Sequence, residues 1–326
     1  MLAHPICHNE AMSLSIGVDI GGTKIAAGVV DEAGTILARR RRPSPADDSN
    51  AALRITTEIV QELVAEFPVA TIGIGVPGFV DPSQKKIIFG PNIDWDGADI
   101  GGQVATATGL ACYLENDANA AAWGEYKFGA ASSYHSPITV TIGTGIGGGI
   151  IIDGKLLRGA SGFAGEIGHM EIVPDGLPCG CGQKGCWEVY GSGNALTATA
   201  RKLAASYPAR AARLLELAGG KVEAISGLLI TEAAQQGDSA AQTAFSETGK
   251  WIGKGLANLA AIFDPDAFVL SGGVCEAKDL LLAPVQSTFT ANLTMAAHRP
   301  QPDLVIAQLG NEAGLIGAAD LARCHP

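Results

Sequence analysis

Two short apolar runs near the start of the chain are separated by a pair of glycines. Residues 16–20 form the first run, which stops at Gly21 and Gly22, and residues 25–30 form the second. Runs of this length that are rich in Val and Ile and bounded by glycine predict two strands joined by a tight turn. Between residues 50 and 66 the apolar positions are spaced by three and four, which predicts an amphipathic helix.

The same pattern returns in the second half of the chain. Residues 138–142 are apolar, residues 143–149 contain five glycines, and residues 150–152 are apolar again before a turn at Asp153 and Gly154. This layout repeats that of residues 16–30 and indicates an internal duplication. Further strands are expected at 36–40, 71–76, 111–115, 268–271 and 304–309, and further helices at 117–128, through much of 193–261, and at 314–322. Strands alternating with helices predict an α/β protein.

Composition and charge restrict the class of protein. The chain has 326 residues, 47% hydrophobic and 17% charged, which is enough for two domains with a large core. A formal charge of −11 argues against a general nucleic-acid or membrane binder, although local backbone amides can still bind phosphate. No run of about twenty apolar residues is present, and the first residues lack a signal peptide. We therefore expect a cytoplasmic protein without a membrane segment, whose translation can begin at Met12.

The first glycine turn reads Asp19-Ile20-Gly21-Gly22-Thr23-Lys24. Glycines leave backbone N–H groups open to phosphate oxygens, and Thr23 and Lys24 add a hydroxyl and a cation. The carboxylate of Asp19 can hold a metal-bound water beside those phosphates. The alternative is an ordinary hairpin turn with a surface lysine. The GxxxxGK[ST] phosphate loop does not occur in this sequence.

Two later turns have a similar character. The glycines from Gly143 to Gly149 lie between two apolar runs and predict a second concave site of phosphate size. Gly272 and Gly273 follow the strand expected at 268–271 and leave room for an adenine or a ribose. For each of these turns the alternative is a glycine bend with a purely structural role.

A third kind of motif combines thiols, an imidazole and carboxylates. Glu166 and His169 are followed by Cys179, Cys181, Cys186 and Glu188, whereas Cys7, Cys112, Cys275 and Cys324 are scattered along the chain. Three thiolates and one imidazole match a tetrahedral structural zinc site, and the glycines between the cysteines let the backbone wrap around an ion. Free buried thiols are the alternative. A fourth motif, Glu115-Asn116-Asp117, stands where a strand is expected to meet a helix, so Asp117 can be a helix N-cap, a general base or both.

Together these segments resemble the phosphate and adenosine loops of the actin-like ATPase and hexokinase fold, and their detail is similar to the ROK family of bacterial sugar kinases and repressors. The resemblance extends over nearly all of the chain after Met12 and is closest to the ATP-dependent glucokinases of that family. It implies a two-lobed, ribonuclease H-like α/β fold with a central cleft and a small zinc-binding loop. Residues 13–118 with 312–326 would form the small lobe, and residues 119–311 the large lobe.

The resemblance also implies a set of site residues. Asp117 is the expected catalytic base. Mg²⁺-bound ATP is expected to contact Asp19, Gly21, Gly22, Thr23, Lys24, Gly143, Thr144, Gly145, Gly272 and Gly273. The sugar is expected to contact Gly78, Asn92, Asn116, Asp117, Glu166, His169 and Glu188, and structural Zn²⁺ to bind His169, Cys179, Cys181 and Cys186. Trp95 is either a stacking platform for the sugar or a packing residue.

The expected reaction is transfer of a phosphoryl group from ATP to the 6-hydroxyl of glucose. Mannose, N-acetylglucosamine and N-acetylmannosamine stay open as acceptors, because no residue in the sequence specifies carbon 2, and polyphosphate stays open as a donor. A ROK repressor is the weaker alternative, since its DNA-binding module does not fit before Asp19. An actin-like assembly ATPase is also weaker, because it has no use for the cysteine cluster. The family implies a homodimer or a higher homo-oligomer.

Overall fold

The computed structural model describes residues 13–45, 48–90 and 97–325. The chain divides into two compact units. Unit 1 comprises residues 1–139, 149–165 and 307–326, and unit 2 comprises residues 140–148 and 166–306. The predicted hairpin at residues 138–152 is therefore shared between the units.

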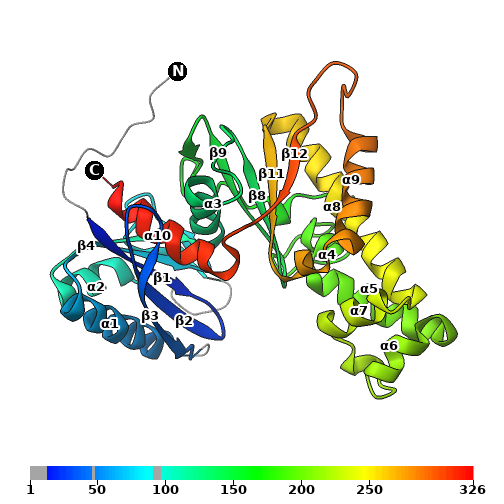
Figure 1. The fold of residues 1–326 in the computed structure, drawn as a ribbon, viewed down its shortest axis with the longest axis horizontal. Coiled ribbons are helices and arrows are strands. Elements are labelled where there is room, and N and C mark those ends of the chain that lie inside the picture. Colours follow the sequence, from blue (N-terminus) through cyan, green and yellow to red (C-terminus); the bar gives the residue numbers. More distant parts are fainter. Residues whose placement is uncertain (1–12, 46–47, 91–96, 326) are drawn as a thin grey trace. The chain divides into compact units, whose positions relative to one another are not determined.

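A mixed five-stranded sheet, in the order β3-β2-β1-β4-β7, forms the framework of unit 1 (Figure 1). Its strands are β1 (Leu14–Ile20), β2 (Lys24–Val30), β3 (Ile36–Pro43), β4 (Val69–Val76) and β7 (Ala111–Asn116). β1 runs antiparallel to β2 and parallel to β4, and β4 runs parallel to β7. The carboxyl ends of β1, β4 and β7 therefore lie at one edge of the sheet.

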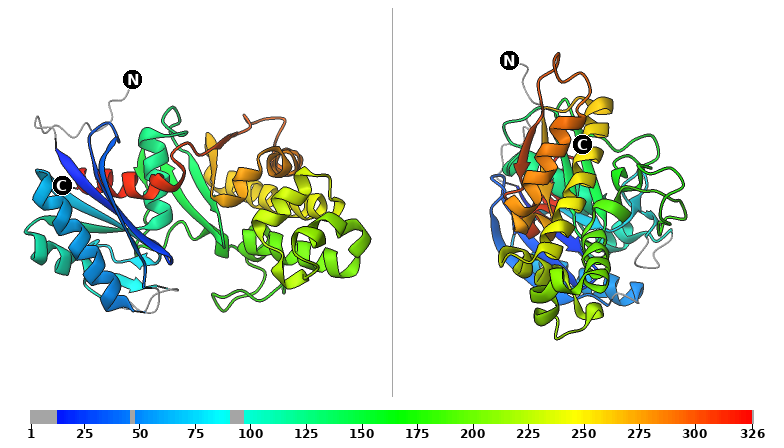
Figure 2. Two further views of the ribbon diagram at one scale, coloured as in Figure 1. Left: turned by 60° about the horizontal axis from the view of Figure 1, so that its bottom comes forward. Right: turned by 90° about the vertical axis from the view of Figure 1, so that its right-hand side faces the viewer.

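Helices cover both faces of this sheet (Figures 1 and 2). α1 (Ser49–Glu66) and α2 (Ile100–Thr108) belong to the core on one face. α10 (Ala313–Arg323) packs on the other face and against α3 (Asp117–Phe128). Gly17 and Gly73 allow this close packing, because a Cβ at either position would collide with a carbonyl oxygen of α10. A two-stranded antiparallel sheet, β5 (Phe79–Val80) and β6 (Ile87–Phe89), follows β4 in the chain.

A second five-stranded sheet repeats the order of the first. It has the order β10-β9-β8-β11-β12 and consists of β8 (Ile138–Ile142), β9 (Ile146–Ile152), β10 (Lys155–Leu156), β11 (Ala267–Ser271) and β12 (Asp303–Ile306). In each sheet the central strand (β1 or β8) is the first of three consecutive strands on one side. Two strands from later in the chain (β4 and β7, or β11 and β12) extend the sheet on the other side. This order confirms the repeated layout that the sequence indicates.

Two expectations about this region are wrong. The glycine turn was expected at residues 143–149, but Gly147, Gly148 and Gly149 lie within β9. A Cβ on Gly149 would collide with the Ala122 side chain, so this glycine permits close packing of β9 on α3. The strand expected at 304–309 ends at Ile306, because the amides of Gln308 and Leu309 donate to the buried Glu125 carboxylate (3.0 and 2.7 Å) instead of to a strand ladder.

Unit 2 is mainly helical. Its α-helices are α4 (Glu188–Gly191), α5 (Gly193–Ser206), α6 (Ala212–Leu217), α7 (Gly227–Gln235), α8 (Ser239–Phe263) and α9 (Asp279–Asn292). The long helix α8 packs along α9, and Phe245 and Phe289 are fully buried there. Across the described part of the chain, no helix has both the length and the hydrophobicity to cross a membrane.

Candidate active site

The first glycine turn joins β1 to β2 at the carboxyl edge of the sheet in unit 1. The amide of Gly21 donates to the carbonyl oxygen of Lys24 (2.9 Å), which closes the turn. Gly22 and Thr23 at its tip are exposed, whereas Asp19 at its base is partly buried. Burial raises the pKa of Asp19, and the charge of Lys24 lowers it in part.

The other two turns lie in unit 2. The amide of Gly143 donates to the carbonyl oxygen of Gly145 (3.0 Å), and its own carbonyl accepts from the amide of Gly193 at the start of α5 (2.8 Å). Gly272 follows β11 with a φ of +93°, and a Cβ there would collide with the Ile142 carbonyl, so the fold itself requires a glycine. Gly273 begins a short 3₁₀ helix (Gly273–Ala277) directly after it.

Each of the three turns contains one glycine that no neighbour among the described residues requires. A Cβ added to Gly22, Gly143 or Gly273 would meet no atom within 4 Å, and none of the three has a left-handed φ. Neither backbone strain nor crowding by the protein therefore explains these glycines. Their backbone is open to a group outside the chain, such as a phosphate that binds backbone amides.

Asn116 and Asp117 stand at the junction of β7 and α3. The structure makes Asn116 the N-cap of α3, because its Oδ1 accepts from the amide of Asn119 (3.0 Å), and this corrects the alternative that Asp117 is the cap. Asp117 is the first residue of the helix, and its Oδ1 accepts from the amide of Ala118 (2.8 Å). Asn116 thus performs the capping, and Asp117 contributes a carboxylate in the first turn.

The register of the sheet places Asp19 and the start of α3, with Asp117, at the same edge of the sheet. Asp19 of β1 pairs with Gly75 of β4, which in turn pairs with Glu115 of β7. Strands are spaced at ~4.8 Å, so β1 and β7 are about 10 Å apart at this level. A Cβ on Gly75 would lie 3.8 Å from the Cα of Asp117, and one on Gly314 would lie 3.7 Å from the Asp19 carboxylate and 3.9 Å from the Asp117 carbonyl oxygen.

Gly78 is placed beside the same junction. The side-chain amide of Asn116 donates to the carbonyl oxygen of Gly78 (3.2 Å), which fixes the chain after β4. A Cβ on Gly78 would lie 2.6 Å from the Phe89 carbonyl oxygen of β6, so close packing explains this glycine. Asn92 and Trp95, the other residues expected to face the sugar, lie outside the described residues.

The expected zinc ligands form one cluster in unit 2. The ligand atoms of His169, Cys179, Cys181 and Cys186 all lie within 4.8 Å of one another. The Cys181 and Cys186 sulfurs are 3.7 Å apart, and the Cys179 sulfur is 3.6 Å from His169 Nδ1. Tetrahedral zinc with ~2.3 Å bonds to sulfur and ~2.05 Å bonds to nitrogen gives about 3.8 and 3.6 Å for these separations. The donor set and its geometry therefore fit zinc.

Two carboxylates flank the cluster. Glu188, the first residue of α4, accepts from the Cys179 thiol (3.0 Å) and lies 3.5 Å from His169 Nδ1. Glu166 Oε2 lies 3.9 Å from the other ring nitrogen of His169. Burial raises the pKa of Glu166, the nearby imidazole lowers it and Glu188 raises it. A Cβ on Gly145 would collide with the Glu188 carboxylate, so the second glycine turn and this cluster are adjacent.

The predicted residues thus assemble into two groups. Unit 1 holds Asp19, Gly21, Gly22, Thr23, Lys24, Gly78, Asn116 and Asp117 at one sheet edge. Unit 2 holds Gly143, Thr144, Gly145, Glu166, His169, Cys179, Cys181, Cys186, Glu188, Gly272 and Gly273.

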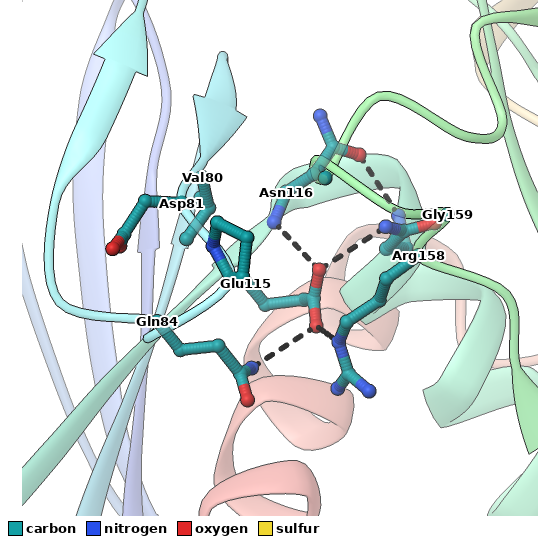
Figure 3. Close-up of a pocket in the computed structure, with 10 residues that line it drawn as sticks. Val80, Asp81, Gln84, Glu115, Asn116, Arg158 and Gly159 are labelled. Carbon is teal, nitrogen blue, oxygen red and sulfur yellow. Dashed lines mark hydrogen bonds and ion pairs between the residues drawn. The ribbon is translucent and has the colours of Figure 1, made fainter.

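A small cavity beside Asn116 contains residues that sequence reasoning missed (Figure 3). It has a volume of about 130 Å³, and its lining includes Gln84, Glu115 and Arg158. Glu115 is only 5% exposed, and its Oε2 accepts from Arg158 Nε at 2.7 Å. One signal was available in the sequence: Glu115 is a charged residue at the end of an otherwise buried strand, which requires a partner.

Comparisons with known proteins extend over almost the whole chain. A model of the ROK family matches residues 15–325. Glucokinase from Streptomyces coelicolor is 48% identical over 96% of this chain and 98% of its own length. The xylose repressor of Bacillus subtilis is 31% identical over 97% of this chain and 79% of its own length.

Solved structures show the same relationship. The crystal structure of a ROK family glucokinase from Streptomyces griseus in complex with glucose and AMPPNP has a TM-score of 0.86 and 48% identity, covering 96% of this chain and 100% of that one. ROK hexokinase from Thermus thermophilus has a TM-score of 0.80 and 34% identity, with 95% and 97% covered. The fold is the two-lobed actin-like hexokinase fold. Because the family model matches residues 15–325 and a curated relative is 48% identical over 96% of the chain, this chain belongs to the ROK family.

Proposed function

We propose that this protein is an ATP-dependent glucokinase that converts glucose and ATP into glucose 6-phosphate and ADP. The observation that carries the proposal is the juxtaposition of Asp19, Asn116 and Asp117 at the carboxyl edge of one parallel sheet segment. The relative from S. coelicolor is a glucokinase, and the S. griseus enzyme was crystallised with glucose and an ATP analogue. In open α/β sheets, ligands bind at this edge.

In the proposed reaction Asp117 is the general base. Its carboxylate accepts the proton of the glucose 6-hydroxyl while that oxygen attacks the γ-phosphorus of ATP. The bond between the γ-phosphorus and the oxygen that bridges it to the β-phosphate breaks, and ADP leaves with the electron pair. The proton passes from Asp117 to solvent after product release. Asn116 binds the sugar beside it, with its position fixed by the bonds to Gly78 and Asn119.

MgATP is the second substrate. The open glycines Gly22, Gly143 and Gly273 support amide contacts to its phosphates and its adenosine. We assign Gly21, Thr23 and Lys24 to the first phosphate turn, Thr144 and Gly145 to the second, and Gly272 to the adenosine turn. Asp19, at the carboxyl end of β1, would hold a water of the magnesium ion.

The sugar hydroxyls are assigned to Gly78 of unit 1 and to Glu166, His169 and Glu188 of unit 2. His169 Nδ1 points to the Cys179 sulfur, so its Nε2 is the nitrogen left for Glu166 and the sugar. Zinc bound by His169, Cys179, Cys181 and Cys186 would fix the orientation of the imidazole and take no part in the chemistry. We further assign residues 13–118 with 312–326 and residues 119–311 to the two lobes, and a cytoplasmic homo-oligomer to the working enzyme.

An assay of ADP release against a panel of hexoses tests the reaction. We expect rapid release with glucose and ATP, slower release with mannose and N-acetylhexosamines, and little release without sugar. The same assay with polyphosphate in place of ATP, read as glucose 6-phosphate, identifies the donor. Sugar-independent release would instead indicate an assembly ATPase, and glucose binding without any turnover would indicate a sugar-sensing repressor.

The first phosphate turn is tested by adding one methyl group. Gly22→Ala should raise the KM for ATP by ~10–100-fold, because a Cβ at the tip keeps a phosphate from the backbone and a hydrogen bond to a charged group contributes ~1.5–3 kcal/mol. Since no atom of the described part of the chain lies within 4 Å of that Cβ, thermal stability should stay unchanged. Gly227→Ala is the matched control, because Gly227 is also exposed and open but begins α7. An unchanged KM for ATP in Gly22→Ala contradicts the assignment.

A further inference from the structure

The buried carboxylate of Glu115 is bonded on both of its oxygens (Figure 3). Oε1 accepts from the backbone amide of Asn116 (3.1 Å) and from the side-chain amide of Asn119 (3.1 Å). Oε2 accepts from Arg158 Nε (2.7 Å) and from Gln84 Nε2 (3.4 Å). Glu115 therefore joins three segments that are distant in the sequence.

The Oε1 bonds restrain the residues on either side of Asp117. Asn116 is held through its amide by Glu115, and Asn119 is held by the same oxygen through its side chain. Asn116 Oδ1 closes the turn by accepting from the amide of Asn119. Asp117 lies between Asn116 and Asn119 in the sequence, and both of these residues are bonded to Glu115. The direction of the Asp117 Cα–Cβ bond therefore depends on the position of the Glu115 carboxylate.

Arg158 makes the shortest of the four hydrogen bonds to that carboxylate (2.7 Å). Its segment is anchored on unit 1 at two further points. A Cβ on Gly162, which has a φ of +82°, would collide with the Val80 carbonyl oxygen, and the Phe163 ring stacks on Phe79 with centroids 4.2 Å apart. Arg158 thus projects from a fixed segment, and its guanidinium can direct one carboxylate oxygen while leaving the other for the start of α3.

Stability alone is a weak reason to keep such a pair. Removing two charges from water costs free energy that their attraction often only balances, and apolar replacements of similar volume are frequently neutral. The side chain of Glu115 is 6% exposed and lies beside the proposed base, where a displacement of about 1 Å can slow a reaction ~100-fold.

We propose that the Glu115–Arg158 pair is a positioning element that orients Asp117 for proton abstraction. The proposal rests on the proposed kinase function, and it adds two residues that do not touch the reacting atoms. The pair sets the first turn of α3, and Asp117 carries out the chemistry. Loss of the pair is therefore expected to slow turnover without weakening the contacts that bind ATP.

The decisive variant is the double replacement Glu115→Gln with Arg158→Met, which removes both charges and leaves no unpaired buried ion. We expect kcat to fall ~10–100-fold, the KM for ATP to change less than about twofold, and the thermal midpoint to stay close to that of the wild type. Arg299→Met is the matched control. Arg299 is another shielded arginine paired with a carboxylate, Asp264, and its loss should alter stability but not kcat.

The outcomes separate the two proposals. A folded double variant with wild-type kcat overturns the positioning role, and so does a rise in the KM for ATP that accompanies the loss of kcat. A similar loss of kcat in Arg299→Met also overturns it, because the effect would then reflect general destabilisation. If the wild-type protein itself releases no ADP in response to any hexose, the proposed function fails. As a second variant, Arg158→Lys keeps the charge, and it should retain more activity than Arg158→Met.

Discussion

Replacing Asp117 by Asn should lower kcat by ~10²–10⁴-fold while glucose still binds. The exchange keeps the size of the side chain and its acceptor oxygen, so the bond from the Ala118 amide can persist. It removes the negative charge that, in the proposed mechanism, accepts the proton of the sugar hydroxyl. The sugar contacts that we propose for Asn116, Glu166, His169 and Glu188 are left in place, so the dissociation constant for glucose should change little.

Single-turnover phosphoryl transfer and glucose titration calorimetry measure the two quantities separately. Asp48→Asn is the matched control, because Asp48 is also a carboxylate at a helix N-terminus, where it caps α1 by accepting from the amide of Ala51 (2.9 Å). Asn caps helices as well as Asp does, so this variant should keep wild-type turnover. Near-normal kcat in Asp117→Asn would mean that another group takes the proton.

Replacing Cys181 by Ser should abolish zinc binding. Three sulfurs and one imidazole lie within 4.8 Å of one another, which suits a zinc ion that balances the charge of the thiolates. Serine is a poor zinc ligand, so its hydroxyl would not replace the Cys181 sulfur. Without the ion, His169 and Glu188 lose their common anchor, and we expect glucose affinity to fall at least ~10-fold. Cys181 is exposed, so its replacement creates no cavity in the core.

Metal analysis by mass spectrometry, together with glucose titration, checks this prediction. About one zinc per wild-type chain and almost none in Cys181→Ser is the expected result. Cys324→Ser serves as the control for loss of a thiol. Cys324 is partly exposed, follows the last residue of α10, and is not one of the four cluster residues. Wild-type protein without zinc would rule out the zinc site. A zinc-free Cys181→Ser variant with normal glucose affinity would show that the metal does not support sugar binding.

Much of the fold could be predicted because its strands are short β-branched runs with buried neighbours. β1, β2, β4, β7, β8 and β11 all lie at runs that the sequence predicts, and the expected ROK family and its fold are confirmed. The errors occurred where tertiary contacts override local pattern. Glycine in β9 looks like a turn in the sequence, but Gly149 is required by the approach of Ala122.

Other elements gave weak local signals. α2 contains two glycines in its first turn, and α9 contains Pro284, so neither has the composition of a helix. In the site, Asn116 and Asp117 are adjacent and equally able to cap a helix, and only the backbone geometry decides between them. Arg158 is separated from Glu115 by 43 positions, and no short motif connects the two residues.

The contact of Gly17 and Gly73 with α10 has a consequence for the order of folding. The ribosome synthesises β1 and β4 early, but the helix that seals this face of their sheet follows residues 166–306. At ~5–20 residues per second, the interval is on the order of ten seconds. During that time the apolar surface around Ala26 and Val30 lacks its cover. The growing chain therefore exposes an apolar surface of the kind that chaperones bind. For the same reason, stop codons before α10 should yield aggregates rather than a smaller working enzyme.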